Sequence, residues 1–356
     1  MKASITAPAR AELPLGAQTA YAQLLEAALA AGHQRGVADL SGSFARKTVK
    51  GATYWYYQYT EPSGKLTQLY VGPDSDAVAH LRRQKSLPGA SARLGPLARS
   101  AAALGCLEIL PRHARVLERL SEYGFFRAGG VLIGTHAFLA FGNMLGIRWA
   151  DSERTEDVDF AHAGKNVSLA LPTNVELNAD PAIKSLGMGF LPVRSLRTAA
   201  GATYLNLREP EFRLDFLTTM HRGGDKPFNH PRLGVTMQPL PFMEYLLEDL
   251  QQAVVFSGDT VVLVNLPSPA RYALHKLIVL GERTGAYATK SAKDLRQAGA
   301  LLTRLKDLRK SDVDRAWKDL VSRGKGWRSR VKPALGRLDR MFPDLAVLRW
   351  LKLPKT

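Results

Sequence analysis

Three aspartates carry the clearest chemistry in this chain of 356 residues. Asp157 and Asp159 are separated by one residue, and Asp215 follows in the run Arg-Leu-Asp-Phe-Leu. Alternate residues of a strand point to the same face, so Asp157 and Asp159 project together. Two neighbouring carboxylates repel each other unless they share a cation or a proton. Because Mg²⁺ prefers carboxylates together with substrate phosphates, these residues predict a magnesium site.

The elements that position these aspartates can be predicted from the surrounding pattern. Residues 125–160 predict a strand, a glycine turn, a helix, a loop and a second strand, in that order. Gly134 and Thr135 form the turn, and N–H groups at the start of the following helix suit a phosphate anion. Asp215 lies on a further predicted strand, because large apolar residues alternate with other residues over 211–217.

This combination resembles the nucleotidyltransferase (DNA polymerase β-like) superfamily. It is most similar to bacterial nucleotidyltransferase-fold proteins related to the toxin half of AbiE-type abortive-infection systems, over about residues 129–302. The resemblance implies two Mg²⁺ ions held by the three aspartates, and an NTP, ATP among the candidates, with its phosphates beside the glycine-threonine turn. The 21-residue gap between Thr135 and Asp157 is longer than in minimal members.

The resemblance also implies roles for two residues in later helices. Lys276, in a Lys-Leu step of a helix that begins after a proline, would contact the nucleotide phosphates. Asp294, in a Lys-Asp step of the next helix, would lie nearby as a support or proton acceptor. Spacing alone leaves the ordinary interpretation open, in which Lys276 is a solvated lysine and Asp294 belongs to a surface pair.

The predicted fold class is α+β, with a nucleotidyltransferase-type mixed sheet flanked by helices. Three regions are expected: an N-terminal helical region with a β-hairpin (1–123), a catalytic domain (124–265) and a basic C-terminal helical domain (266–356). Within the catalytic domain, the pattern also predicts a short strand over 166–171 and a helix over 241–252.

The hairpin is expected at about 52–71, where aromatic and β-branched residues flank a Pro-Ser-Gly turn. Its outward residues include Tyr54, Tyr56 and Gln58, or else their neighbours, with basic residues just upstream. Two interpretations stay open. The tyrosines stack on the bases of a nucleic acid, or they are half-buried cover in a hairpin packed on a helix.

The charge of the chain points to an anionic partner. Lys and Arg exceed Asp and Glu by 17, and residues 282–356 hold 20 Lys and Arg against 8 Asp and Glu. Such a surplus attracts nucleic acid, so RNA, tRNA in particular, is the expected acceptor, bound by the basic C-terminal domain. Residues 322–330 are expected to form a loop, either gripping a phosphate backbone or solvated between helices.

Several classes of protein and site are disfavoured. No apolar run approaches the ~18 residues of a membrane span. The single cysteine, Cys106, fits a reducing cytoplasm. The histidines include no His-x-x-x-His pair, so a zinc hydrolase site has no support. His136, directly after the glycine-threonine turn, either contacts substrate or packs inside the fold. A cytoplasmic protein that does not enter membranes is therefore expected.

The expected function is Mg²⁺-dependent transfer of NMP from an NTP to an acceptor hydroxyl, as a toxin or phage-defence factor with an antitoxin partner protein. One alternative is a non-catalytic nucleotidyltransferase-fold protein that binds nucleic acid or nucleotide. In another, the acidic pair is structural, with Asp157 as a cap and Asp159 in a salt bridge to an arginine.

Overall fold

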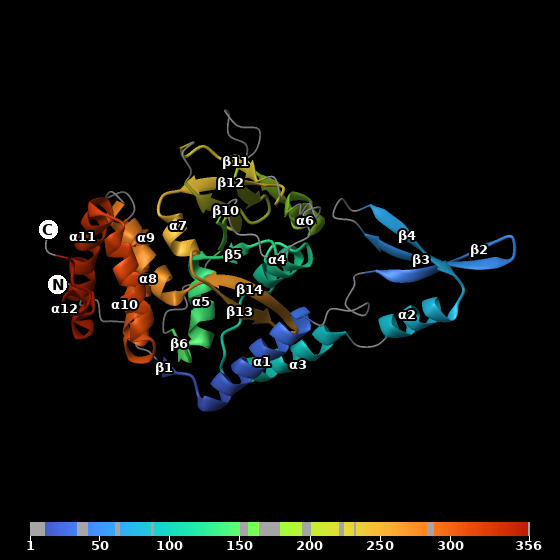
Figure 1. Ribbon diagram of the computed structural model, residues 1–356, viewed down its shortest axis with the longest axis horizontal. Helices are drawn as coiled ribbons and strands as arrows, with labels where there is room; N and C mark the ends of the chain where they lie inside the picture. Colours follow the sequence, from blue (N-terminus) through green and yellow to red (C-terminus); the bar gives the residue numbers. More distant parts are fainter. Residues whose placement is uncertain are drawn as a thin grey trace.

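The computed structural model describes residues 11–33, 42–60, 65–86, 89–149, 156–163, 179–193, 201–220, 224–230, 233–282 and 288–354. Figure 1 shows a body built on a mixed sheet, a set of helices on one side of it, and a small lobe that projects from the other side. The predicted α+β class is confirmed. The short strand expected over 166–171 lies outside the described residues.

The sheet of the body has the order β11-β12-β10-β7-β5, and β9 joins β10 beside β12 while β8 joins β9. At its centre β7, β10 and β12 are parallel, whereas β5 runs antiparallel to β7. The strand bounds are β5 Gly130–Leu132, β7 Asp157–His162, β8 Phe190–Pro192, β9 Thr203–Asn206, β10 Arg213–Thr219, β11 Phe228–His230 and β12 Val235–Leu240.

Side chains of β7 and β10 alternate between the hydrophobic core and the face that carries the aspartates. Val158 and Phe160 on β7, and Leu214 and Phe216 on β10, are fully buried. The rings of Phe160 and Phe216 stack with their centroids 5.1 Å apart. Because successive side chains of a strand point to opposite faces, this burial places the intervening aspartates on the other face of the sheet.

Helices and a separate two-stranded ribbon surround this sheet. The ribbon is β13 Leu250–Ser257 and β14 Thr260–Pro267, paired along its whole length. The other elements of this part are β1 Ala11–Glu12, α1 Leu15–His33, η2 Ala90–Arg93, α3 Leu94–Ala103, α4 Pro111–Glu122, β6 Ile147–Arg148, α5 Gly134–Met144, α6 Ala179–Ser185 and α7 Met243–Leu247. Helices α1 and α3 form a second, smaller hydrophobic cluster with Val254 and Phe256 of β13.

The helix expected over 241–252 is wrong. Only α7, Met243–Leu247, is helical, and β13 begins at Leu250. Each residue of 250–257 pairs with a residue of β14. The backbone groups of residues 250–252 therefore form the hydrogen bonds of the ribbon and not those of a longer helix. Phe242, just before α7, has a left-handed backbone with φ +65°.

The C-terminal part is helical: α8 Pro269–Glu282, α9 Ala288–Leu308, α10 Lys310–Ser322, α11 Lys325–Met341, η4 Pro343–Leu345 and α12 Val347–Trp350. Its buried residues are continuous with the core of the sheet. The loop expected over 322–330 is wrong, because α11 begins at Lys325 and its first turns lead into a face that buries Val331, Leu335 and Leu338.

The projecting lobe contains β2 Ser43–Val49, β3 Ala52–Thr60, β4 Leu66–Pro73 and α2 Asp76–Ser86. As expected, β3 and β4 pair antiparallel; β2 adds a third strand on the other side of β3. Figure 1 shows this lobe standing clear of the body. No helix in the described part of the chain is long and apolar enough to cross a membrane.

Candidate active site

The turn between β5 and α5 holds Gly134 against the carboxylate of Asp159. Gly134 has φ +62°, and a Cβ added to it would overlap Oδ2 of Asp159. The N–H of Ile133 donates to the carbonyl oxygen of Asp159 at 2.9 Å, which joins the end of β5 to β7. Both the backbone conformation and the contact therefore require glycine at this position. Thr135 follows as the second residue of α5 and is buried.

The register between β7 and β10 determines the positions of Asp215 and Asp157 relative to Asp159. Asp215 of β10 is aligned with Asp159 of β7, and Arg213 is aligned with Asp157. Aligned residues of neighbouring strands project on the same face about 4.8 Å apart. The Thr203 hydroxyl donates to Oδ1 of Asp215 at 2.5 Å, so β9 holds this carboxylate from the far side.

Asp157 is bound by Arg213 through both carboxylate oxygens. Nε of Arg213 donates to Oδ1 at 2.9 Å and Nη2 donates to Oδ2 at 2.7 Å. This fork raises the pKa of Arg213 above its usual value, so the guanidinium stays charged. The structural alternative placed an arginine on Asp159, whereas here the arginine is on Asp157.

The fold thus brings Asp159 and Asp215 together beside Gly134. Asp157 lies two residues before Asp159 on β7 and is paired with Arg213. Across the described ranges, no group of three His, Cys, Asp or Glu side chains is arranged to hold a metal ion unaided. The two aligned carboxylates still fit Mg²⁺ as ligands, because this ion commonly takes one or two protein carboxylates and completes its shell with water and substrate phosphates.

Helix α8 places Tyr272 and Lys276 over the same turn. The Tyr272 hydroxyl donates to the carbonyl oxygen of Gly134 at 2.7 Å. Burial raises the pKa of Tyr272 well above its usual value, so the hydroxyl remains a donor. Nζ of Lys276 lies 2.5 Å from Oδ1 of Asp294 on α9, and the two side chains are 13% and 10% exposed. Neither is therefore the solvated surface residue of the ordinary interpretation.

Two adjoining cavities open on this cluster, and Asp159, Leu217 and Leu240 line both. The first, of about 370 Å³, contains the site residues Gly134, Asp159, Lys276 and Asp294 among mostly apolar neighbours: Ile133, Leu217, Leu240, Pro241, Phe242, Met243, Leu246, Tyr272, His275 and Val279. The second, of about 440 Å³, is bounded by Asp215 and Thr203. Both volumes lie in the range of small-molecule sites.

His136 lies inside the fold, as one of its two interpretations proposed. Its Nε2 is 2.9 Å from Nδ1 of His113 on α4, and both rings are 1% exposed. Burial lowers the pKa of His136 to about 3 and that of His113 to about 4, so the pair is neutral at pH 7. His136 therefore supports the start of α5 from within the core.

Comparison with known proteins identifies the family. A family model described as Nucleotidyltransferase matches residues 111–322, which is more than half of the chain and includes β5, β7, β10, α8 and all of α9. The chain belongs to the nucleotidyltransferase family. The match begins at α4 and ends at the end of α10, so the projecting lobe lies outside it.

A solved structure offers a weaker likeness to this nucleotidyltransferase. The antigenic nucleotidyltransferase-like protein from Paracoccidioides brasiliensis is 15% identical, with a TM-score of 0.35; the match covers 69% of this chain and 95% of that one. No curated protein matches the chain.

Sequence reasoning missed three residues that hold the site of this nucleotidyltransferase: Arg213, Thr203 and Tyr272. A signal for Arg213 was present, because it precedes Asp215 by two residues and so shares its face of the strand. No comparable signal marked Thr203 or Tyr272, since their contacts depend on how β9 and α8 pack.

Proposed function

We propose that this nucleotidyltransferase transfers NMP from an NTP to a hydroxyl of RNA in a Mg²⁺-dependent reaction. One observation carries the proposal. Asp159 and Asp215 are in register on adjacent parallel strands, and the carboxylate of Asp159 lies against Gly134 at the start of α5. Acidic oxygens and a helix N-terminus meet there, and these groups suit a metal-bound triphosphate.

Mg²⁺ fits the oxygens of Asp159 and Asp215, and Asp157 supplies a third carboxylate if it exchanges Arg213 for the ion. Bound there, the ion would neutralise charge on the phosphates and leaving pyrophosphate and favour deprotonation of the attacking hydroxyl. A second Mg²⁺ is part of the proposal, with its remaining ligands drawn from substrate.

The residues of the chain itself bind and orient the nucleotide. Gly134 lets the backbone approach the phosphates, and the N–H groups of Gly134 and Thr135 face an anion at the start of a helix. Lys276 supplies positive charge in the same cavity, and Asp294 fixes its Nζ. Tyr272 holds the turn through the Gly134 carbonyl oxygen. The apolar wall of the first cavity suits a nucleobase and excludes water.

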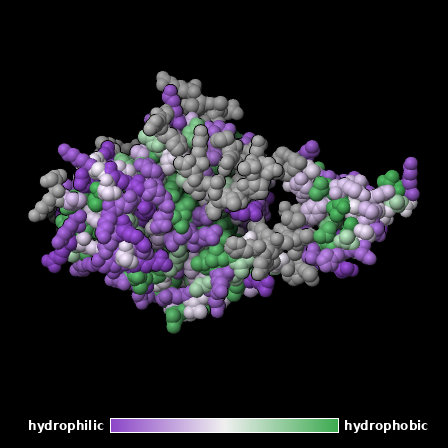
Figure 2. Space-filling view, in the orientation of Figure 1, coloured by the Kyte–Doolittle hydropathy of each residue, from purple (hydrophilic) through white to green (hydrophobic). Residues whose placement is uncertain are grey.

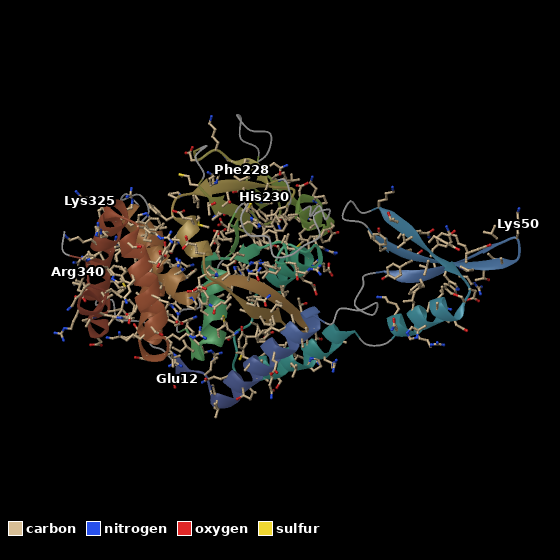
Figure 3. All side chains as sticks on the ribbon, viewed as in Figure 1. Glu12, Lys50, Phe228, His230, Lys325 and Arg340 are labelled. Carbon is tan, nitrogen blue, oxygen red and sulfur yellow. The ribbon has the colours of Figure 1, made fainter. Side chains whose placement is uncertain are left out.

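The acceptor is assigned to RNA because of charge. Residues 282–356 carry 12 of the 17 surplus positive charges of the chain. Figure 2 shows a hydrophilic surface over the C-terminal helices, and Figure 3 places Lys325 and Arg340 on the outer helix α11. The second cavity, beside Asp215, provides space for the acceptor end. tRNA is the acceptor we propose to test first.

The test measures incorporation of each of the four labelled NTPs into total RNA, and into tRNA alone, with Mg²⁺. We expect incorporation by the native chain and its loss in Asp159→Asn and in Asp215→Asn. Asp307→Asn, an exposed aspartate on α9, is the matched control and should retain activity. Incorporation that persists in Asp159→Asn would overturn the proposal.

The alternative function, a nucleotide or nucleic-acid binding protein without turnover, predicts a different pair of results. Isothermal titration would then show NTP binding that Mg²⁺ leaves unchanged, together with no incorporation by the native chain. Two in-register carboxylates beside the turn favour the enzyme, because a site without metal has no use for their mutual repulsion.

The resemblance to AbiE-type toxins extends the proposal to a toxic or phage-defence role with an antitoxin partner. Induced expression of the native chain in a bacterial host should then arrest growth, whereas Asp159→Asn should not. Growth arrest by both chains would separate toxicity from nucleotidyl transfer.

A further inference from the structure

The projecting lobe carries a second cluster of candidate functional residues, and the family match does not cover it. The lobe comprises residues 43–86, and the match begins at residue 111. Its three strands and one helix pack on each other, and Figure 1 shows them apart from the body. The cavities beside Asp159 include no residue of the lobe.

One face of the lobe sheet is covered by α2. Trp55 of β3 is 8% exposed, its Nε1 donates to Oδ1 of Asp74 at 2.9 Å, and Arg82 of α2 lies 3.6 Å from its ring centroid. Val78 of α2 is buried against Gly72 of β4. The sheet is thus supported from behind by its own helix, as the second interpretation of the hairpin proposed.

The opposite face carries a row of tyrosines. Tyr54 and Tyr56 lie on the face opposite Trp55, and the register aligns Tyr70 of β4 with Tyr56. The Tyr56 and Tyr70 ring centroids are 5.4 Å apart, and those of Tyr54 and Tyr70 are 6.3 Å apart. Tyr70 is 52% exposed, and Tyr54 and Tyr56 are half-buried.

Hydrogen-bonding and charged groups extend the tyrosine row. Lys47 of β2 is aligned with Tyr54, and its Nζ lies 4.5 Å from the Tyr56 ring centroid. Gln58 and Gln68 are aligned beyond Tyr56, and Nε2 of Gln68 donates to Oε1 of Gln58 at 3.2 Å. The row therefore runs from a cation, over three rings, to two amides.

The lobe is strongly basic. Over 42–60 and 65–86 there are seven Lys and Arg against two acidic residues, and one of these, Asp74, is bonded to Trp55. The strands themselves contain no Asp or Glu. Figure 3 shows Lys50 at the far tip of the lobe, where the turn between β2 and β3 ends the molecule. The charge of the lobe thus complements a phosphate backbone.

We infer that the tyrosine row of the lobe, Tyr54, Tyr56 and Tyr70 flanked by Lys47, binds single-stranded nucleic acid. Every nucleobase has a π-face that stacks on an aromatic ring, and cations beside the rings follow the backbone. A protein partner is disfavoured because a row flanked by lysine and without acidic groups offers little to a mixed protein surface. A duplex is disfavoured because its bases are already stacked.

The two cavities and the lobe lie in different parts of the molecule, so this inference does not require nucleotidyl transfer. If both the proposed function and this inference are correct, the lobe binds an unpaired segment of the RNA whose end is extended at Asp159.

In Figure 2 the exposed lobe surface shows pale and green residues beside hydrophilic ones, in contrast with the mainly hydrophilic C-terminal helices.

The test uses the full chain without NTP or Mg²⁺ and fluorescein-labelled 12-mers of mixed sequence: RNA, DNA of the same sequence, and the RNA duplex. We expect anisotropy to show that the single strands bind at least ten-fold more tightly than the duplex. The triple variant Tyr54→Ala, Tyr56→Ala, Tyr70→Ala should weaken binding roughly ten-fold or more per stacked base. The matched triple variant with Phe at these positions keeps the rings and should bind like the native chain.

A second measurement locates the contact. A 12-mer with 5-iodouracil is cross-linked by light, and mass spectrometry of the digest should find the link on Tyr54, Tyr56 or Tyr70. An unchanged Kd in the Ala variant, equal binding of the duplex, or cross-links confined to the C-terminal helices would each overturn the inference. So would a change in sedimentation from dimer to monomer in the Ala variant with unaltered binding, because the row would then be a self-association surface.

These results are distinguishable from failure of the proposed function. Asp159→Asn leaves the lobe intact and should bind the 12-mer normally while losing NTP incorporation. The Ala variant keeps the cavities intact and should still incorporate label into a short acceptor at saturating concentration. Far-UV circular dichroism and thermal unfolding confirm that each variant is folded.

Discussion

The polar groups around Asp159, on the central strands of the sheet, and those around Tyr70, in the lobe, have different surroundings. Around Asp159, polar groups are held by specific neighbours: Lys276 by Asp294, Asp215 by Thr203, and the Gly134 carbonyl by Tyr272. In the lobe, rings and cations lie on an open surface. The first arrangement suits the proposed site, where reacting atoms must be held in place, and the second suits the proposed interface, which would accept many nucleic-acid sequences.

The largest expected effect on stability concerns the buried ion pair between Lys276 and Asp294. Lys276→Met removes the cation from a carboxylate that is only 10% exposed, so we expect the free energy of unfolding to fall by about 3–5 kcal/mol. Urea unfolding followed by tryptophan fluorescence measures this change.

The matched control is the exposed pair of Lys310 and Asp314 on α10, with side chains 55% and 37% exposed. Lys310→Met should cost less than about 0.5 kcal/mol, since helical surface pairs contribute little. Equal losses in the two variants would show that burial does not control the strength of the inner pair.

Gly134→Ala should cost activity more than stability. The added Cβ overlaps Oδ2 of Asp159, so the carboxylate proposed to hold Mg²⁺ must move, and a misplacement of about 1 Å in an active site lowers kcat/KM by about 10²-fold. The NTP incorporation assay measures it.

Gly51→Ala in the lobe is the control for the backbone conformation alone. Gly51 has φ +79° with no atom near its missing Cβ, so the substitution introduces strain without a clash. Incorporation should be unaffected in Gly51→Ala. Equally native activity in Gly134→Ala would show that neither the φ of Gly134 nor its close contact with Asp159 is needed for incorporation.

The contrast between the two regions also explains what the sequence could predict. The order of strand, glycine turn, helix and strand, and the common face of Asp157 and Asp159, follow from local periodicity. The ion pair on Asp157 depends on the register between β7 and β10, which joins residues 56 positions apart. Local patterns place Arg213 on the face of Asp215, but they contain no information on which residue of β7 it pairs with.

Two errors have the same physical origin. The helix predicted over 241–252 included residues 250–252, which instead pair with residues 265–267 of β14. The basic loop predicted over 322–330 contains two glycines and is helical from Lys325, because the apolar face of α11 packs on α8. In both cases tertiary packing outweighed local propensity.

The histidine pair under the site should make the stability of the body depend on pH. Burial lowers the pKa of His113 to about 4 and of His136 to about 3, below the ordinary value of 6.5 in the unfolded chain. Between these values the unfolded chain binds more protons, so the pair's stabilisation is complete above pH 6.5 and is lost as pH falls. The slope approaches about 1.4 kcal/mol per pH unit for each histidine.

Urea unfolding at pH 7, 6 and 5 checks this dependence. His136→Gln should flatten the slope, whereas replacement of the exposed His80 in the lobe by Gln should not. A slope that is unchanged in His136→Gln would assign the pH dependence to other groups.

Among the residues of the site, the smallest effect on stability is expected for the ion pair between Arg213 and Asp157, whose side chains are 44% and 31% exposed. A double-mutant cycle with Arg213→Gln and Asp157→Asn should give a coupling free energy of about 0.2–1 kcal/mol in unfolding. Incorporation separates the two roles of the aspartate. If Asp157 leaves the arginine to bind the metal-bound nucleotide, Asp157→Asn loses activity while Arg213→Gln keeps most of it. If both variants lose activity equally, Asp157 acts only through its arginine, and the site consists of Asp159 and Asp215.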